Sequence, residues 1–314
     1  MAVGCGRDDD AGNASVTGDE EPRSSSDARR PGGESRPALC SALGVRVTGR
    51  VATPAASELS GMALSRSQPG VLWTHNDSGD SARVLALAED GRLRAELEVP
   101  SSSNRDWEEI AIAREPGGDG DALYIGDIGD NLARRSEIAV YVVPEPQGGD
   151  RMSGATAPAQ RIALRYPDGA HDAEALLVDP LSGALAIVTK SFGGRARVYT
   201  GSPRAHGRAG TQTLGQAGSL SLGPGEAVTA GSVSATGRTV VLRSYGHAYV
   251  WTRRPRESLA GVLRRAPCVA GAGLISEGQG EAVAVSGDGR ALYTVAEGER
   301  PLVRRYAAPG PPPP

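Results

Sequence analysis

The stretch Asp106-Trp-Glu-Glu-Ile-Ala-Ile-Ala113 places three carboxylates at the start of a small, apolar, strand-like segment. Similar stretches recur along the chain: Glu108, Glu174, Glu226 and Glu281 align at spacings of 66, 52 and 55 residues, and Glu58 aligns with Asp106. A repeat near 50 residues with strand-like contents is typical of a β-propeller. The four other copies read Glu58-Leu-Ser-Gly-Met-Ala-Leu, Asp172-Ala-Glu-Ala-Leu-Leu-Val, Glu226-Ala-Val-Thr-Ala-Gly and Glu281-Ala-Val-Ala-Val-Ser.

Alternating apolar residues, separated by Gly, Asp and Asn turns, predict four strands in each of the first four repeats. The fifth repeat offers three strands, over Ala282–Ser286, Ala291–Val295 and Val303–Tyr306. Val45–Val51 is a further strand without a partner, and pairing it onto the fifth repeat would leave no exposed sheet edge there. We therefore predict an all-β fold, a single five-bladed β-propeller closed by an N-terminal strand.

Two outer strands and the number of blades depend on weaker patterns. Gln212–Leu214 is the predicted outer strand of the third repeat, and Val262–Arg264 is that of the fourth. Six blades is the alternative, because residues 147–167 or 202–223 could contain another pair of strands.

Both ends of the chain lack material for a core. Residues 6–39 are rich in Gly, Ser, Asp, Glu, Arg and Pro, which predicts a disordered linker, and residues 308–314 form a disordered Pro-rich tail. The propeller is therefore assigned to residues 40–307. The net charge of −3 provides no basic field for nucleic acid, and no run of about 18 apolar residues could span a membrane.

The three cysteines point to export. Met1-Ala-Val-Gly-Cys5 resembles the end of a bacterial lipobox, so residues 1–5 are interpreted as the remnant of a lipoprotein signal with Cys5 as the lipidated residue; the alternative is a chance match. Membrane contact is expected through this lipid anchor alone.

Cys40 and Cys268 flank most of the fold and are predicted to form a disulfide, which requires an oxidising compartment; two buried free thiols are the alternative.

Propeller topology gathers the polar segments at one face. The first strand of a blade starts, and the second ends, at the same mouth of the central channel. Residues at these strand ends, including Asp172 and Glu297, are therefore expected to lie around that mouth. So many carboxylates repel each other unless a cation compensates them, and Ca²⁺ takes six to eight oxygen ligands from such a set. The metal candidates are Asp77, Asp106, Glu108, Glu109, Asp127, Asp130 and Glu174, and the ligand-binding candidates are Glu58, His75, Asn76, Asn131, Lys190, Glu226, Arg243, Tyr245 and Glu281.

A structural role competes with this interpretation. Asp and Asn before Gly are what β-turns need, and a Glu at a strand start can bond backbone N–H groups of a neighbouring blade. Asp106, Glu108 and Glu109 together exceed what a turn needs, which favours function there. The sequence has no Gly-x-Ser-x-Gly elbow, no His-Glu-x-x-His and no Cys-x-x-Cys, so catalytic residues stay unassigned.

These residues are similar to those of a known group of proteins. Glu58-Leu-Ser-Gly-Met-Ala, Trp73-Thr-His-Asn-Asp-Ser-Gly and Asp106-Trp-Glu-Glu-Ile-Ala together resemble the SdiA-regulated and phytase-like β-propellers. The resemblance covers residues 55–131 well, and 170–192 and 279–297 loosely. It implies an exported propeller with an acidic, calcium-binding mouth, and its phytase-like members imply phosphoester hydrolysis.

Two functions follow as expectations. The first is an exported lipoprotein, expected to be a monomer, whose acidic mouth binds Ca²⁺ and an unknown small-molecule or protein ligand. The alternative is a metal-dependent phosphoester or other ester hydrolase that uses the same mouth, with Lys190 and Arg243 holding an anion.

Overall fold

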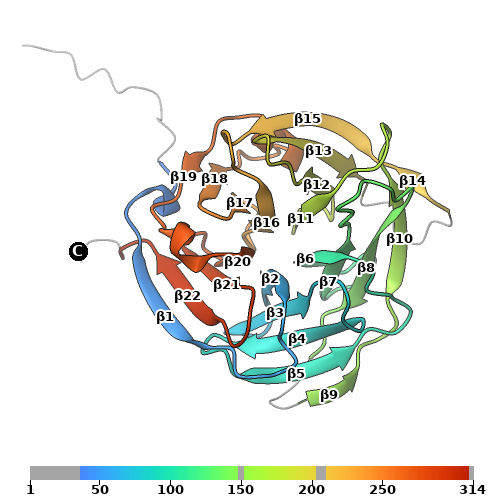
Figure 1. Ribbon diagram of the computed structural model, residues 1–314, viewed down its shortest axis with the longest axis horizontal. Coiled ribbons are helices and arrows are strands. Elements are labelled where there is room, and N and C mark those ends of the chain that lie inside the picture. The colour runs from blue at the N-terminus through green and yellow to red at the C-terminus, as the bar shows by residue number, and fades with distance from the viewer. Residues whose placement is uncertain (1–35, 148–151, 203–209, 311–314) are drawn as a thin grey trace, which may run out of the picture. The chain divides into compact units, whose positions relative to one another are not determined.

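Five sheets lie in a ring around a central channel, so the protein is a five-bladed β-propeller (Figure 1). The computed structural model describes residues 36–147, 152–202 and 210–310, and the chain from Arg36 onward forms this unit. The predicted fold class and blade number are confirmed. The predicted lipobox at Cys5 and most of the predicted linker lie outside the described residues, whereas Ala38–Cys40 forms a short 3-10 helix with Leu39 buried.

The innermost strand of each blade lines the channel, and the second strand pairs with it antiparallel. Most residues of these strands are buried, because both faces of each sheet pack against neighbouring blades. The inner strands are β2 (Leu59–Leu64), β6 (Trp107–Arg114), β11 (Ala173–Val178), β16 (Val228–Val233) and β20 (Gly280–Val285). The second strands are β3 (Val71–Asn76), β7 (Asp121–Asp127), β12 (Leu185–Thr189), β17 (Thr239–Ser244) and β21 (Ala291–Ala296).

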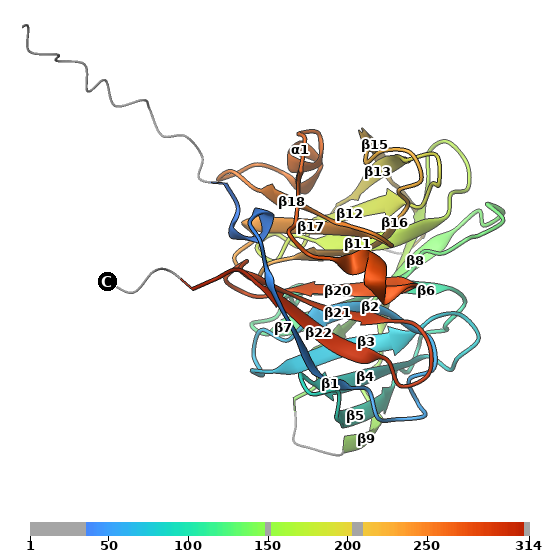
Figure 2. The same ribbon diagram turned by 60° about the vertical axis from the view of Figure 1, so that its left-hand side comes forward.

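The third and fourth strands form the outer part of each blade, as the view from the side shows (Figure 2). The third strands are β4 (Arg83–Ala88), β8 (Ile138–Pro144), β13 (Arg195–Gly201), β18 (Ala248–Thr252) and β22 (Leu302–Ala307). The fourth strands are β5 (Leu93–Glu98), β10 (Gln160–Arg165), β15 (Gly215–Ser221), β19 (Cys268–Val269) and β1 (Gly44–Arg50). Blades are numbered 1 to 5 by their inner strands, from β2 to β20.

The ring is closed as predicted. The N-terminal strand β1 pairs antiparallel with β22, from Gly44 opposite Ala307 to Arg50 opposite Leu302. A disulfide joins Cys40 to Cys268 of blade 4, with 5.9 Å between the Cα atoms. The N-terminal segment is thus hydrogen-bonded to blade 5 and covalently bound to blade 4.

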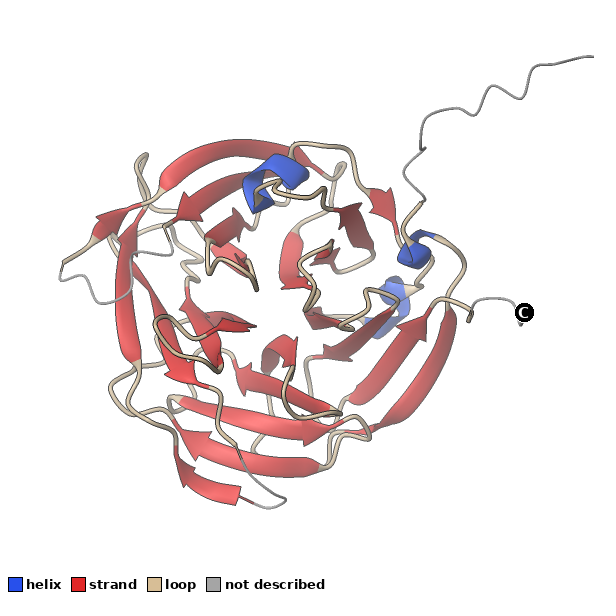
Figure 3. Ribbon diagram, turned by 180° about the vertical axis from the view of Figure 1, so that it is seen from behind, coloured by secondary structure: helices blue, strands red, loops and turns tan. Residues whose placement is uncertain are grey.

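Two predicted outer strands were wrong. Gln212–Thr213 is β14, which pairs in parallel with β10 of blade 2, while the fourth strand of blade 3 is β15. Leu259–Leu263 is a helix, α1, capped by Ser258, and the two-residue strand β19 takes the predicted outer position of blade 4. The residues that suggested a sixth blade instead supply β14 and β9 (Met152–Ala155), which each add a parallel edge strand to an existing sheet. The view from behind shows how little of the ring is helical (Figure 3).

The core consists of five apolar clusters, one between each pair of neighbouring blades. Alternate residues of a strand point to opposite sheet faces, so each blade contributes to two clusters. Trp73 and Trp107 fill the cluster between blades 1 and 2, and Trp251 fills that between blades 3 and 4. A search of the described residues finds no helix suited to crossing a membrane.

Every inner strand has a β-bulge at the same height, one or two residues into the strand. A bulge adds one residue that the ladder does not pair, and it turns that side chain away from the regular alternation. The unpaired residues are Gly61, Glu108, Glu174, Thr229 and Glu281. The repeat seen in the sequence is therefore a repeated bulge near the mouth of the channel.

Candidate metal centre at the mouth of the channel

Three of the five bulge residues are glutamates, on blades 2, 3 and 5. Glu108, Glu174 and Glu281 occupy equivalent places in their strands and are at most 5% exposed. The predicted alignment of Glu226 with them was wrong, because the equivalent residue of blade 4 is Thr229. Glu226 lies three residues before the bulge, where its carboxylate accepts hydrogen bonds from Ser244 and pairs with His247 at 2.8 Å.

Glu108 is the centre of a group of five carboxylates, which we call the acidic group. Ligand oxygens of Asp77, Asp106 and Glu108 all lie within 4.8 Å of one another, and so do those of Glu108, Asp172 and Glu174. Asp77 follows β3, and Asp106 and Asp172 directly precede β6 and β11, so the ends of strands in three blades converge here. Of the predicted metal residues, the structure brings together Asp77, Asp106, Glu108 and Glu174.

Asp172 belongs to this group although the sequence analysis gave it no ligand role. The signal was present, because Asp172-Ala-Glu174 repeats the spacing of Asp106-Trp-Glu108. Its Oδ1 also accepts a hydrogen bond of 2.8 Å from the backbone N–H of Asp130, which holds the side chain in place.

Burial and mutual repulsion raise the pKa values of the acidic group. Burial, and then the charges of Asp77 and Asp172, raises the pKa of Asp106 to about 6. Burial, followed by the charges of Glu174 and Asp77, raises the pKa of Glu108 well above its usual value. Burial also raises the pKa of Glu174 to about 7, although Lys190 opposes this. At neutral pH the group therefore retains protons or requires a compensating cation.

One oxygen of the group is buried with no hydrogen-bond donor other than a neighbouring carboxyl. Glu174 is 2% exposed; its Oε1 accepts a hydrogen bond of 2.5 Å from Lys190 Nζ, while its Oε2 has no N–H or hydroxyl donor, so a proton retained on the neighbouring Glu108 carboxyl would supply its hydrogen bond in the cation-free protein. A buried carboxylate oxygen normally has a donor, and leaving one unsatisfied costs about 1–3 kcal/mol or more. Oxygen atoms at this spacing fit a hard divalent ion, which would satisfy the orphaned oxygen.

A second polar set adjoins the acidic group on its Lys190 side. Lys190 Nζ lies 3.8 Å from Glu281 and 5.8 Å from the ring centre of Tyr245, whose hydroxyl donates to Glu281 at 2.9 Å. Burial lowers the pKa of Lys190, but Glu174 and Glu281 more than offset this and raise it, so the side chain stays an ammonium. Burial and the neighbouring Glu281 raise the pKa of Glu297 to about 8.

Asp127 and Asp130, both predicted as metal ligands, lie outside the acidic group and form hydrogen bonds that hold the adjoining backbone in place. Asp127 forms an ion pair of 2.8 Å with Arg135 and accepts a hydrogen bond from the backbone N–H of Asp106. Asp130 accepts from the backbone N–H of Arg135, whose guanidinium also donates to Gly129 O. This buried network fixes the loop after β7, and Asn131 beyond it is exposed.

Glu109 lies within the channel and not at its mouth. Its carboxylate is fully buried and accepts hydrogen bonds from the backbone N–H groups of Met62, Ile110 and Gly231. It thereby joins blades 1, 2 and 4, which is the structural role that competed with metal binding in the sequence analysis.

Other predicted ligand-binding residues are also structural. Arg243 is fully buried and pairs with Glu277 at 2.7 Å, so it is not available at the mouth. Asn76 is buried, and its amide bonds Ser57, Glu58, Ala55 and Asp80 around a turn. His75 is completely buried beside it, which lowers its pKa to about 4. Glu58 itself stays exposed, next to Asp77, whose backbone N–H donates to Glu58 O.

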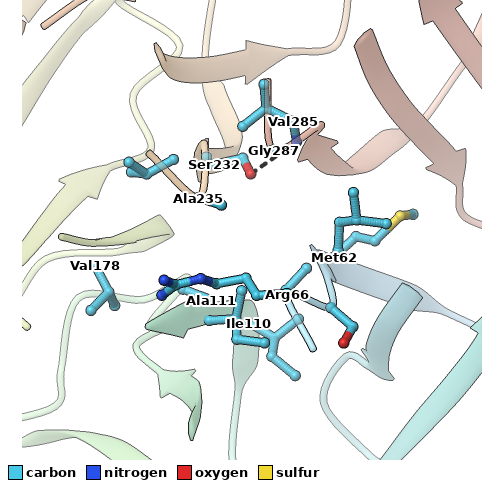
Figure 4. A pocket seen from close by; sticks show the side chains of 15 residues that line it. Met62, Arg66, Ile110, Ala111, Val178, Ser232, Ala235, Val285 and Gly287 are labelled. Atoms are coloured by element: carbon cyan, nitrogen blue, oxygen red, sulfur yellow. Dashed lines mark hydrogen bonds between the residues drawn. The ribbon is translucent and has the colours of Figure 1, made fainter. Parts of the chain in front are cut away.

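Beyond Glu109, the opposite half of the channel holds a cavity of ≈ 150 Å³ (Figure 4). Its walls are largely apolar and include Met62, Ile110 and Val178, with Arg66 extended across the space and a hydrogen bond from Val285 N to Ser232 Oγ. Met62 and Gly231 both line this cavity and donate to Glu109. The channel is therefore acidic at one end and apolar at the other, with Glu109 between them.

Comparisons with known proteins give only distant structural similarities. No known family profile matches the chain, and no curated protein sequence matches it. Among solved structures, it is similar to a luciferin-regenerating enzyme (TM-score 0.47, 10% identity, 85% of this chain and 96% of that one) and to a gluconolactonase from Xanthomonas campestris (TM-score 0.44, 14% identity, 90% and 99%). It is also similar to the WD40 repeats of RRP9 (TM-score 0.42, 10% identity, 84% and 97%). All three TM-scores lie below 0.5, so the assignment of the β-propeller fold depends on the sheet topology of this chain.

Proposed function

We propose that the acidic mouth binds a divalent cation and that the occupied mouth binds a ligand. The observation that carries this proposal is the orphaned, buried Oε2 of Glu174 within a group of five carboxylates. A purely structural acidic ring would be expected to satisfy that oxygen with a donor, as Glu109 is satisfied by three backbone N–H groups.

Ca²⁺ is the cation that the donor set favours. All candidate ligands are carboxylate oxygens, with no thiolate or imidazole in either three-residue group, and hard cations prefer such donors. Ca²⁺ tolerates irregular geometry and six to eight oxygen ligands, whereas Mg²⁺ demands a near-ideal octahedron. Glu108 is common to both groups, so one substitution there affects the whole site.

The setting supports an exported protein that binds a ligand from solution. The disulfide is typical of an oxidising compartment, and lipidation at Cys5 would anchor the propeller at a membrane. The quoted resemblance to SdiA-regulated and phytase-like propellers agrees with both the export and the calcium site. The ligand is a small molecule or a protein partner, not a nucleic acid, and the protein acts as a monomer.

The test is thermal unfolding of the full chain in EDTA and in Ca²⁺. At 100 times the dissociation constant, a bound ion adds about 2.7 kcal/mol. For a domain of this size we expect the midpoint to rise by roughly 5–10 °C. Glu108→Gln should abolish the rise, and Glu98→Gln, an exposed residue on β5, should keep it. Equal midpoints in EDTA and Ca²⁺ for the unchanged protein would refute the proposal.

A metal-dependent ester hydrolase is the second candidate, favoured by Lys190 and Tyr245 at the edge of the acidic group. A bound divalent cation polarises an ester or phosphoester oxygen. Lys190 would hold the anionic part of the substrate, and Tyr245 would orient it by a hydrogen bond. Calcium-dependent turnover of p-nitrophenyl phosphate or p-nitrophenyl acetate that falls in Tyr245→Phe would support this function. Cation binding without turnover of either ester would leave the first function.

A further inference from the structure

A polar cleft of ≈ 540 Å³ opens beside blade 3, outside the acidic mouth. It lies at the same face of the propeller, because Arg195 begins β13 just after the loop that follows β12, where Lys190 is found. The lining residues are Asp168, Ser191, Arg195, Arg197, Gln216, Gly218 and Ser219.

Strand alternation presents two arginines to this cleft. Arg195 and Arg197 lie on one face of β13, while Ala196 and Val198 between them are buried in the core shared with blade 4. Ser219 on β15 is paired with Arg197 across the sheet, and its Oγ accepts a hydrogen bond of 3.1 Å from Arg195 Nε. The two guanidinium groups therefore share one wall of the cleft.

The charges of the cleft do not cancel. Arg197 forms an ion pair of 2.7 Å with Asp168, which also accepts a hydrogen bond from Tyr199. Arg195 has no carboxylate partner within the described parts of the chain, so one positive charge is uncompensated. Ser191 and Ser219 add hydroxyl donors at the same place. A planar guanidinium with hydroxyls beside it is the donor arrangement that proteins use for carboxylates and phosphates.

We propose that this cleft binds an oxyanion, a carboxylate or a phosphate group, through Arg195 with Ser191 and Ser219. The cleft and the acidic mouth share chain segments, since Ser191 follows Lys190 and Asp168 precedes Asp172 by four residues. This inference rests on the proposed function. If both sites bind the same ligand, that ligand carries oxygen atoms that contact the cation and an acidic group that contacts Arg195. An anion would be repelled by the carboxylates of the mouth, so a separate basic anchor supplies what the mouth lacks.

The experiment measures anion binding without the cation. The full chain is first freed of divalent cations with EDTA and dialysed into metal-free buffer, because EDTA is itself a polycarboxylate. It is then titrated calorimetrically at low ionic strength, with inorganic phosphate in one arm and succinate in the other. We expect saturable binding of at least one anion. Losing a charge-assisted hydrogen bond costs about 1.5–3 kcal/mol, so Arg195→Gln should weaken binding roughly ten- to hundred-fold. Arg46→Gln makes the same change at an exposed position on β1, in blade 5, and should stay within about two-fold.

The outcomes separate this site from the cation site. Retained anion binding in Glu108→Gln, together with its loss in Arg195→Gln, supports the cleft even if the cation proposal fails. No saturable binding of either anion, or equal weakening in Arg195→Gln and Arg46→Gln, overturns the cleft. The arm with the tighter binding identifies the acidic group as phosphate or carboxylate.

Discussion

The Glu174 side chain lies between a cation, Lys190, and the other carboxylates of the acidic group. Its Oε1 accepts from the Lys190 ammonium at 2.5 Å, and its Oε2 faces other carboxylates without an N–H or hydroxyl donor. The raised pKa values of Glu174 (about 7) and Asp106 (about 6) are consequences of that arrangement. Because these folded-state values exceed the unfolded ones near 4, the acidic group binds more protons in the folded protein between about pH 4 and 8. Buried His75, with its pKa lowered to about 4, has the opposite effect below about pH 6.5, but it is a single group.

The stability of the cation-free protein should therefore depend on pH. In this window the free energy of unfolding falls as pH rises, so the EDTA-treated protein should melt higher at pH 6 than at pH 8. Scanning calorimetry at both values tests this. Glu174→Gln removes one contribution in this window and should reduce the dependence, as should saturating Ca²⁺, while Glu297, with its pKa raised to about 8, keeps part of it. A midpoint that rises with pH in EDTA would contradict the assignment.

Lys190 competes with the proposed cation for the same carboxylate. In Lys190→Met the stability in EDTA should fall by about 1–3 kcal/mol, because a buried carboxylate loses its donor. Calcium affinity should rise several-fold, since a positive charge is removed from the site. Urea denaturation and calorimetric titration measure the two effects. A Ca²⁺ affinity that drops instead would mean that Lys190 helps to build the site.

The sequence predicted four of the five residues of the acidic group, because strand starts and ends are readable from turn signals. It misaligned Glu226, because Glu226-Ala-Val reads like Glu281-Ala-Val, whereas the bulge of blade 4 falls three residues later, at Thr229. It also placed Arg243 at the mouth, because strand position alone does not reveal the buried partner Glu277, which lies 34 residues away.

Among the structural elements, the inner-strand bulge has the largest effect on the site. In blade 1 the bulge residue is Gly61, with φ of +60°, and an added Cβ would come within 2.7 Å of Ile110 N and 2.8 Å of Glu109 Cα. Gly61→Ala should therefore destabilise the protein by about 2–4 kcal/mol, combining backbone strain with overpacking. Urea denaturation measures the difference.

Gly79→Ala is the matched control for that substitution. Its φ is +88°, and nothing lies within 4 Å of an added Cβ, so backbone strain acts alone and the cost should stay near 1 kcal/mol. Equal losses at the two positions would show that the close approach of blades 1 and 2 contributes nothing.

Outer strands were harder to predict than inner ones. The inner and second strands are buried on both faces, so their apolar runs are unmistakable. The outer strand β15 reads Gly-Gln-Ala-Gly-Ser-Leu-Ser and is half exposed, which leaves little pattern. The two-residue strand β19 is too short for periodicity, and α1 just before it provides apolar residues that mimic a strand.

For the whole molecule, closure depends on both hydrogen bonds and a covalent bond. The Cys40–Cys268 disulfide closes a loop with a sequence separation of 228 residues. The chain-entropy model assigns about 5 kcal/mol to such a loop, and measured losses on removing native disulfides are about 2–5 kcal/mol. The Cys40→Ser/Cys268→Ser double variant should lose stability in that range in denaturant titrations, and reductant should lower the midpoint of the unchanged protein only. Cation binding should survive, because the acidic group lies on blades 1 to 3.

Because of the repeated bulge, the residue that each blade places near the mouth of the channel is not one of those that pair its strands. The unpaired residue takes no part in the strand ladder, so exchanging it changes the chemistry of the opening and leaves the ladder hydrogen bonds in place. Its contacts with the neighbouring blade, such as the hydrogen bond from Thr229 Oγ1 to Gly280 O, change with it. Blades 2, 3 and 5 use this freedom for glutamate and blade 4 for threonine, while crowding restricts blade 1 to glycine. The side chain at the bulge can therefore be changed in four of the five blades, and each change would alter the binding specificity of the mouth separately.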